Sequence, residues 1–86
     1  MASSSEFPVS EYYKPFIREG HTITKGGGWW SAALLIDDPK ARKPMVSLYR
    51  WQLTEEGWKM RKSFNCRDKE DLRLIIKVLG ELESLL

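Results

Sequence analysis

The sequence is short of the residues that form covalent cross-links and metal sites. It contains one cysteine, Cys66, and one histidine, His21, in 86 residues. A single cysteine excludes an internal disulfide, and no second histidine is present to activate Cys66 as a nucleophile. His21 has no grouping of cysteines or carboxylates around it at the spacing of metal ligands. We therefore expect a protein of a reducing, intracellular compartment (cytoplasm, nucleoid or nucleus) that holds no metal or other cofactor.

Patterns typical of catalysis or of membranes are also missing. The three consecutive glycines of residues 26–28 lack the Lys and the Ser or Thr of a phosphate-binding loop. No acid pair or catalytic triad is visible, so we do not expect an enzyme. No apolar run approaches the roughly 20 residues of a membrane span, and the N-terminus MASSSEFPVS has neither the basic nor the apolar region of a signal peptide. The sequence predicts a soluble protein without membrane contact.

Net charge is small, but it is unevenly distributed. The chain has 14 basic and 12 acidic residues, a formal charge of +2. Residues 40–67 hold eight basic and two acidic residues, a net charge of +6, whereas residues 1–39 and 68–86 each carry −2. The eight basic residues are Lys40, Arg42, Lys43, Arg50, Lys59, Arg61, Lys62 and Arg67. Their concentration predicts that the middle of the chain holds an anionic partner.

Length and hydrophobic pattern predict one small α+β domain. Residues 1–10 are Ser-rich without periodicity, so we expect a flexible segment there and a single domain over residues 11–86. Three stretches have the composition of strands: WWSAALLID, MVSLYRWQLT and WKMRKSFNC. A fourth strand would have to come from residues 12–25. We expect a curved antiparallel sheet of three or four strands followed by a C-terminal helix.

The final segment, RDKEDLRLIIKVLGELESLL, has the pattern of an amphipathic helix. Asp68 stands at the N-cap position, and Asp71 follows in the first turn. One apolar stripe consists of Leu72, Ile75, Leu79, Leu82 and Leu86, and Leu74, Ile76, Val78 and Leu85 widen it. This is more apolar surface than a small sheet covers. We therefore expect a homodimer that forms through the helix and the sheet, with this stripe at the interface.

The turn EEG decides which aromatic residues share a face. If Glu55 and Glu56 form a two-residue loop, Trp51 faces Met60 and one large apolar face results. Tight two-residue turns need positive φ, which two glutamates do not supply, whereas Gly57 supplies it readily. We therefore favour a three-residue loop that ends in Gly57.

The three-residue loop pairs Trp51 with Arg61 and Tyr49 with Ser63. The expected solvent face then carries Ser47, Tyr49, Trp51, Lys59, Arg61 and Asn65. The expected core face carries Val46, Leu48, Trp58, Met60, Phe64 and Cys66. Arg50 and Gln52 fall among the core-facing positions in this register, and we expect them at the rim of the sheet or at a subunit contact.

The expected solvent face interleaves flat rings with cations, as single-stranded nucleic acid requires for base stacking and phosphate contact. Alternation along WWSAALLID places Trp30 with the core, so Trp29 joins the solvent face. The candidate stacking residues are Trp29, Tyr49 and Trp51, and the candidate phosphate-binding residues are Lys59, Arg61, Lys40, Arg42 and Lys43. We expect Trp30, Trp58 and Phe64 to be core residues. A protein–protein interface would use the same aromatic face, so an assembly module is the alternative function.

Two stretches, VSLYRWQ and KSFNCRDKEDLRLIIKVLGEL, resemble the transcriptional positive-cofactor-four family. They are similar to that family's second strand and to its last strand running into the helix. The resemblance implies a curved antiparallel sheet, a dimer formed through the C-terminal helix, and binding of single-stranded DNA in transcription. If residues 12–25 form no strand, another sheet-plus-helix module, such as the single-strand binders of heat-loving archaea, fits equally well. The resulting prediction is a homodimer that binds single-stranded nucleic acid, with DNA as the expected form and with little sequence preference.

Overall fold

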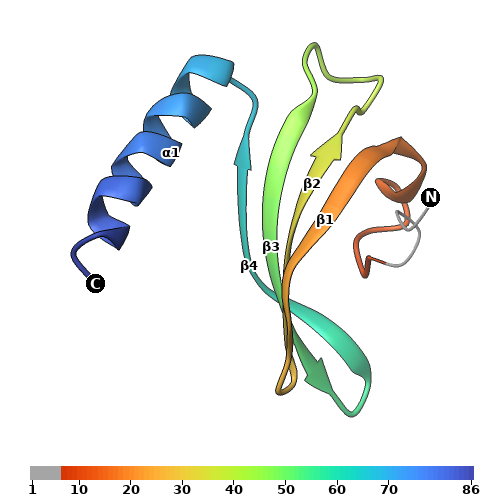
Figure 1. Ribbon diagram of the computed structural model, residues 1–86. Helices are drawn as coiled ribbons and strands as arrows, with labels where there is room; N and C mark the ends of the chain where they lie inside the picture. Colours follow the sequence, from red (N-terminus) through yellow and green to blue (C-terminus); the bar gives the residue numbers. More distant parts are fainter. Residues whose placement is uncertain (1–6) are drawn as a thin grey trace.

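A four-stranded antiparallel sheet, with its strands in the order β1-β2-β3-β4, forms the body of the molecule. The computed structural model describes residues 7–86. A short 3₁₀ helix (Lys14–Phe16) precedes β1 (Ile17–Gly26), β2 (Trp29–Ile36), β3 (Met45–Thr54), β4 (Gly57–Cys66) and α1 (Lys69–Glu83). The sheet is strongly curved, with α1 on one side and residues 7–16 on the other (Figure 1). The predicted α+β class is confirmed, and β1 supplies the fourth strand.

One face of the sheet forms the hydrophobic core, and we call it the covered face. Alternation along β2 buries Trp30, Ala32, Leu34 and Ile36, each at most 4% exposed, as the sequence predicted. In the register between β2 and β3, Trp51 lies opposite Trp30 and Met45 lies opposite Ile36, so these β3 residues share the covered face. The opposite face, which is directed toward α1, is called the open face below.

Residues 7–16 lie over the covered face and complete the core. Phe7 is only 3% exposed, and its ring centroid lies 5.6 Å from that of Trp30 and 6.2 Å from that of Trp51. Gly20 makes room for this ring, because a Cβ there would lie 2.6 Å from Phe7 Cε2. Phe7 falls within the stretch 1–10 that the sequence predicted to be flexible, and residues 1–6 of that stretch lie outside the described residues. The packed domain therefore includes residues before the predicted boundary at residue 11.

Glycines with positive φ form the two hairpin turns. Gly27 and Gly28 have φ of 61° and 84° and make the tight turn between β1 and β2, which needs positive φ at both central positions. In the turn between β3 and β4, Gly57 has φ of 110°, and no non-glycine residue among 7–86 has positive φ. The predicted signs of φ are therefore confirmed: φ is positive at Gly57 and not at Glu55 or Glu56.

The predicted pairing near this turn is nevertheless wrong. Trp51 pairs with Met60, as a two-residue loop requires, and not with Arg61. Arg61 is then an extra residue on β4, and this β-bulge shifts the register. Beyond the bulge, Tyr49 pairs with Ser63 as predicted.

The bulge and the pairing with β2 together overturn the predicted faces. Ser47 and Trp51, expected at the solvent face, are 0% exposed on the covered face. Four residues expected in the core lie instead on the open face: Val46, Leu48, Phe64 and Cys66. The prediction used the β3–β4 hairpin alone, whereas the core side of β3 is determined by Trp30 and its neighbours on β2. It also assumed unbroken alternation along β4, and the extra residue breaks that alternation.

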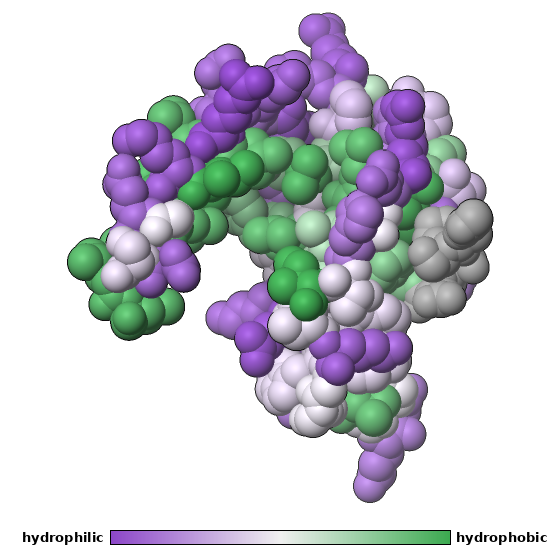
Figure 2. Space-filling view, viewed as in Figure 1, coloured by the Kyte–Doolittle hydropathy of each residue, from purple (hydrophilic) through white to green (hydrophobic). Residues whose placement is uncertain are grey.

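Helix α1 begins as predicted but buries little of its apolar surface. The Asp68 side chain caps it by accepting a hydrogen bond from the Glu70 N–H at 2.8 Å. The helix contacts the sheet chiefly at β4, and no residue of α1 is buried. Within the predicted stripe, Leu79 is 54% exposed and Leu82 is 55% exposed. Hydrophobic residues extend along α1 and onto the neighbouring sheet (Figure 2).

Candidate functional site

The open face is divided into two ends of different chemistry. Read across β2, β3 and β4, the two rows of residues nearest the hairpin turns are Trp29, Gln52, Lys59 and then Ser31, Arg50, Lys62. The next two rows are Ala33, Leu48, Phe64 and then Leu35, Val46, Cys66. We call the first pair of rows, with the bulged Arg61, the cationic end, and the second pair the apolar end. The sheet register therefore separates positive charge from apolar surface along one face.

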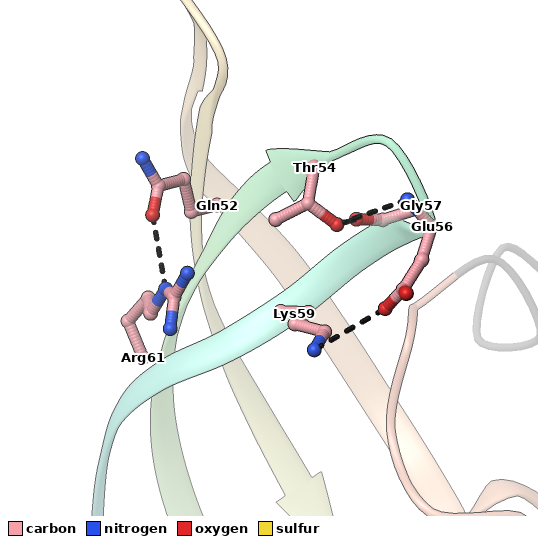
Figure 3. Close-up of polar contacts among 6 residues, drawn as sticks. All are labelled: Gln52, Thr54, Glu56, Gly57, Lys59 and Arg61. Atoms are coloured by element: carbon pink, nitrogen blue, oxygen red, sulfur yellow. Dashed lines mark hydrogen bonds and ion pairs between the residues drawn. The ribbon is translucent and has the colours of Figure 1, made fainter.

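Side-chain contacts order the cationic end. The Arg50 guanidinium lies over the Trp29 ring, with Cζ 4.5 Å from the ring centroid. Arg61 Nε donates a hydrogen bond to Gln52 Oε1 at 2.9 Å, and Lys59 Nζ lies 3.3 Å from Glu56 Oε1 (Figure 3). A half-exposed indole under the Arg50 guanidinium, with Arg61 and Lys59 at the same end of the face, offers a ring for stacking and donors for phosphate oxygens.

The positive charge of this region is not neutralised within the described chain. Of the eight basic residues between 40 and 67, Lys59 alone forms an ion pair with a carboxylate among residues 7–86. The other four ion pairs of the described residues involve basic groups outside this region. The predicted local excess of positive charge is therefore exposed on the folded surface, where it attracts anions.

The candidate nucleic-acid-binding residues that were predicted from the sequence lie at three separate places in the structure. Trp29, Lys59 and Arg61 lie together on the open face. Trp51 is 0% exposed on the covered face, so its predicted exposure for base stacking is wrong. Tyr49 is half-buried on the same side, and its ring stacks on that of Trp51 with a centroid distance of 5.3 Å and an interplanar angle of 9°. Burial raises the pKa of the Tyr49 phenol above 10.0.

Lys40, Arg42 and Lys43 form the third group. They lie in the connection between β2 and β3, at the end of the sheet away from the two hairpin turns (Figure 1). The Lys40 ammonium lies 5.8 Å from the Tyr12 ring centroid, and the Lys43 carbonyl accepts a hydrogen bond from Arg67 Nη1 at 2.8 Å. The structure therefore does not bring this group together with Lys59 and Arg61.

Three residues of the cationic end were not among the candidates. Arg50 and Gln52 had been assigned to core-facing or rim positions and Lys62 had no assigned position, yet all three share the open face with Trp29. Alternation along β2 places Trp29 on this face, but only the register between strands adds the other residues, because it pairs Trp29 with Gln52 and Ser31 with Arg50.

Comparison with protein-family models, curated proteins and solved structures finds no match for this chain. Residues 7–86 contain no group of three or more His, Cys, Asp or Glu side chains arranged to hold a metal ion. No helix in the same residues combines the length and hydropathy of a membrane span. The site must therefore be interpreted from its own geometry.

Proposed function

We propose that the protein binds single-stranded nucleic acid, with DNA as the expected form, at the cationic end of the open face. The observation that supports this proposal is the Arg50 guanidinium over the Trp29 ring, with Arg61 and Lys62 at the same end of the open face and none of the three paired with a carboxylate among residues 7–86. Phosphates neutralise such cations, and an unpaired base stacks on the indole. Contacts of this kind depend little on base sequence.

We also propose that the functional unit is a homodimer. The apolar end of the open face and the apolar side chains of α1 are adjacent and largely exposed in one chain, with Phe64 48% and Leu74 60% exposed. A second copy that covers both surfaces would remove them from water and leave the cationic end free. Homodimerisation also supplies two nucleic-acid sites in one particle, which increases the apparent affinity for a long strand.

A salt-dependent titration tests the nucleic-acid proposal. Oligo-dT is expected to quench tryptophan fluorescence, and the logarithm of its binding constant should fall with the logarithm of salt concentration by about 0.7 per phosphate contact. Arg50→Ala and Lys62→Ala should each weaken binding and reduce that slope by about one contact. Lys77→Ala is the matched control, because Lys77 is exposed on α1 and paired with Glu81. Absence of quenching and of any salt effect at low ionic strength would exclude the proposal.

The apolar end favours a second candidate function, an assembly module for other polypeptides. Ile23 and Leu48 are 59% and 39% exposed and line one shallow depression with Arg50 and Phe64. Leu48→Asp should change the mass of the protein in solution under either function, so the oligonucleotide decides between them: for an assembly module it would have no effect on the mass. Size-exclusion chromatography with and without oligo-dT separates the two functions.

A further inference from the structure

The covered face holds a continuous group of rings beneath the N-terminal segment. The aromatic cluster consists of Trp30, Tyr49, Trp51 and Trp58. Centroid distances are 5.0 Å between Trp30 and Trp51, 5.3 Å between Tyr49 and Trp51, and 5.4 Å between Trp30 and Trp58. Phe7 stacks on this cluster at 27° to the Trp51 ring, in the position that a flat ligand ring would take.

Among the described residues, residues 7–13, which include Phe7, are attached to the sheet only through side chains. Among the described residues, the backbone hydrogen bonds of residues 7–13 are local, such as those from Val9 N–H to the Phe7 carbonyl and from Tyr13 N–H to the Ser10 carbonyl. The first backbone bond between the N-terminal segment and the sheet region joins Asp37 N–H to the Phe16 carbonyl, at 2.9 Å. Phe7 can therefore leave the aromatic cluster without breaking a strand ladder.

One polar group beneath Phe7 lacks the partner that it needs. The Trp51 Nε1–H is fully buried and has no hydrogen-bond acceptor among residues 7–86. The Trp30 Nε1–H, by contrast, donates to Thr22 Oγ1 at 3.0 Å. An unpaired buried donor is costly, and the phenyl ring of Phe7 offers it no lone pair. A flat aromatic ring with polar atoms at its edge would fit among these rings, and an acceptor that lies in the plane of the Trp51 indole would satisfy this donor.

We infer that the aromatic cluster is a second binding site, for an unpaired nucleobase, and that Phe7 occupies it as an internal competitor in the free protein. The inference rests on the proposed function and adds to it a site on the opposite face of the sheet. Lys25 provides a phosphate contact there, because its Nζ lies 3.9 Å from the Trp30 ring centroid and 5.9 Å from that of Trp58. Trp29 and Trp30 are consecutive, so one strand passing around β2 at its hairpin end meets both sites.

The test compares the full chain with two Phe-to-Leu variants. Phe7→Leu keeps an apolar side chain in the core but removes the competing ring. Phe16→Leu makes the same change in a residue that packs against the core and pairs its ring with Tyr12, not with the aromatic cluster. If the Phe7-bound form predominates by about ten to one, Phe7→Leu should bind oligo-dT about tenfold more tightly, while Phe16→Leu stays within about twofold of the wild type.

A second measurement uses the wild-type protein alone and does not depend on how the variants fold. In the free protein, nuclear Overhauser contacts should join the Phe7 ring to the Trp51 indole. Saturating oligo-dT should abolish these contacts and shift the Trp51 Nε1–H resonance, because a different ring then lies over the indole. The inference fails, and the proposed function stands, if oligo-dT binds while the contacts persist and Phe7→Leu binds no more tightly. An equal gain for Phe16→Leu also overturns it, and absence of binding in every variant removes both proposals.

Discussion

At the scale of single residues, Trp29 and Trp30 show how one strand serves two surfaces. Trp30 is 4% exposed and lies among the rings of the covered face, whereas Trp29 is half-exposed under the Arg50 guanidinium. The two residues are neighbours in sequence and identical in chemistry. Substitution of each in turn therefore separates folding from binding.

Trp30→Ala should lower the free energy of unfolding by about 3–5 kcal/mol, because it leaves a large cavity in the core. Trp29→Ala should change that free energy by less than about 1 kcal/mol and weaken oligo-dT binding by about 1–3 kcal/mol through loss of a stacked base. Urea unfolding and fluorescence titration measure the two effects. Equal losses of stability in both variants would show that Trp29 is a core residue.

Gly20 is a second residue at which one added carbon atom should change the stability of the protein. A Cβ at this position would lie 2.6 Å from Phe7 Cε2 and 2.8 Å from Leu34 Cδ2. Gly20→Ala should therefore destabilise the protein by about 1–3 kcal/mol through overpacking. Gly26→Ala is the control, because nothing lies within 4 Å of a Cβ there and its φ is not positive. The control should be neutral or stabilise by up to about 1 kcal/mol, and a similar loss in both variants would contradict the steric argument.

At the scale of elements, we expect the contact of Tyr12 with Asp38, which helps to attach the N-terminal segment, to respond to pH. The Tyr12 hydroxyl donates to Asp38 Oδ1 at 2.9 Å, and this bond raises the pKa of Tyr12 above 10.0. The Lys40 backbone N–H also donates to Asp38, and it contributes most to lowering the pKa of that carboxyl below 3.8, with Tyr12 adding to the effect. The folded pKa of Asp38 lies below the unfolded one, so its contribution is present above about pH 4 and is lost as the pH falls through the folded pKa.

We therefore expect the Phe7 contact with Trp51 to weaken as the pH falls below about 4. Exchange of the Trp51 indole hydrogen with solvent measures this change. Asp38→Asn keeps an acceptor that does not titrate, so its exchange should lack this component. The same acid response in both proteins would assign the effect to other carboxyl groups.

Strands β2, β3 and β4 and helix α1 could be predicted from sequence, because each depends on local pattern, whereas β1 was left open. Alternation identified the core side of β2, and Asp68 identified the start of α1. The assignment of faces on β3 failed because it depends on a pairing between strands joined by residues 37–44 and on the bulge at Arg61. Neither the pairing of β2 with β3 nor the bulge can be recognised from the sequence of the β3–β4 hairpin alone. The burial of Phe7 was missed for the same reason, since the space over Gly20 that accommodates its ring forms only when the sheet folds.

The candidate site could be predicted in composition but not in arrangement. The cationic middle of the chain and the position of Trp29 opposite Trp30 were read correctly from residue pattern. The grouping of Trp51 with Lys59 and Arg61 was wrong, because the ladder places the indole and these cations on opposite faces. Arg50 and Lys62 joined the site only through cross-strand pairing.

At the scale of the whole molecule, a single chain leaves two apolar surfaces exposed on the same side. Leu79 and Leu82 of α1 and Phe64 of β4 are each about half exposed, at 54%, 55% and 48%. Soluble proteins rarely leave such contiguous apolar surface open unless another polypeptide covers it. The homodimer proposed above accounts for both surfaces with one partner.

Leu79→Glu should therefore convert the protein to a monomer, because it places a charge on the surface that the second copy covers. Light scattering measures the mass directly. Glu83→Gln, an exposed polar change on the same helix, should leave the mass unchanged. A wild-type protein that is monomeric at micromolar concentration, or a Leu79→Glu variant that stays dimeric, would contradict the proposed interface.

The bulge on β4 also constrains how the length of this strand can vary. Arg61 has no partner across the ladder, whereas Met60 and Lys62 on either side pair with the consecutive residues Trp51 and Arg50. Removal of Arg61 would leave a regular ladder in which every remaining pair is kept, whereas removal of a residue farther along β4 would invert the side chains between the gap and the bulge. A natural variant with a β4 strand one residue shorter should therefore lack a residue at this position. Its sheet should be less bent and less twisted there, because the bulge would be absent.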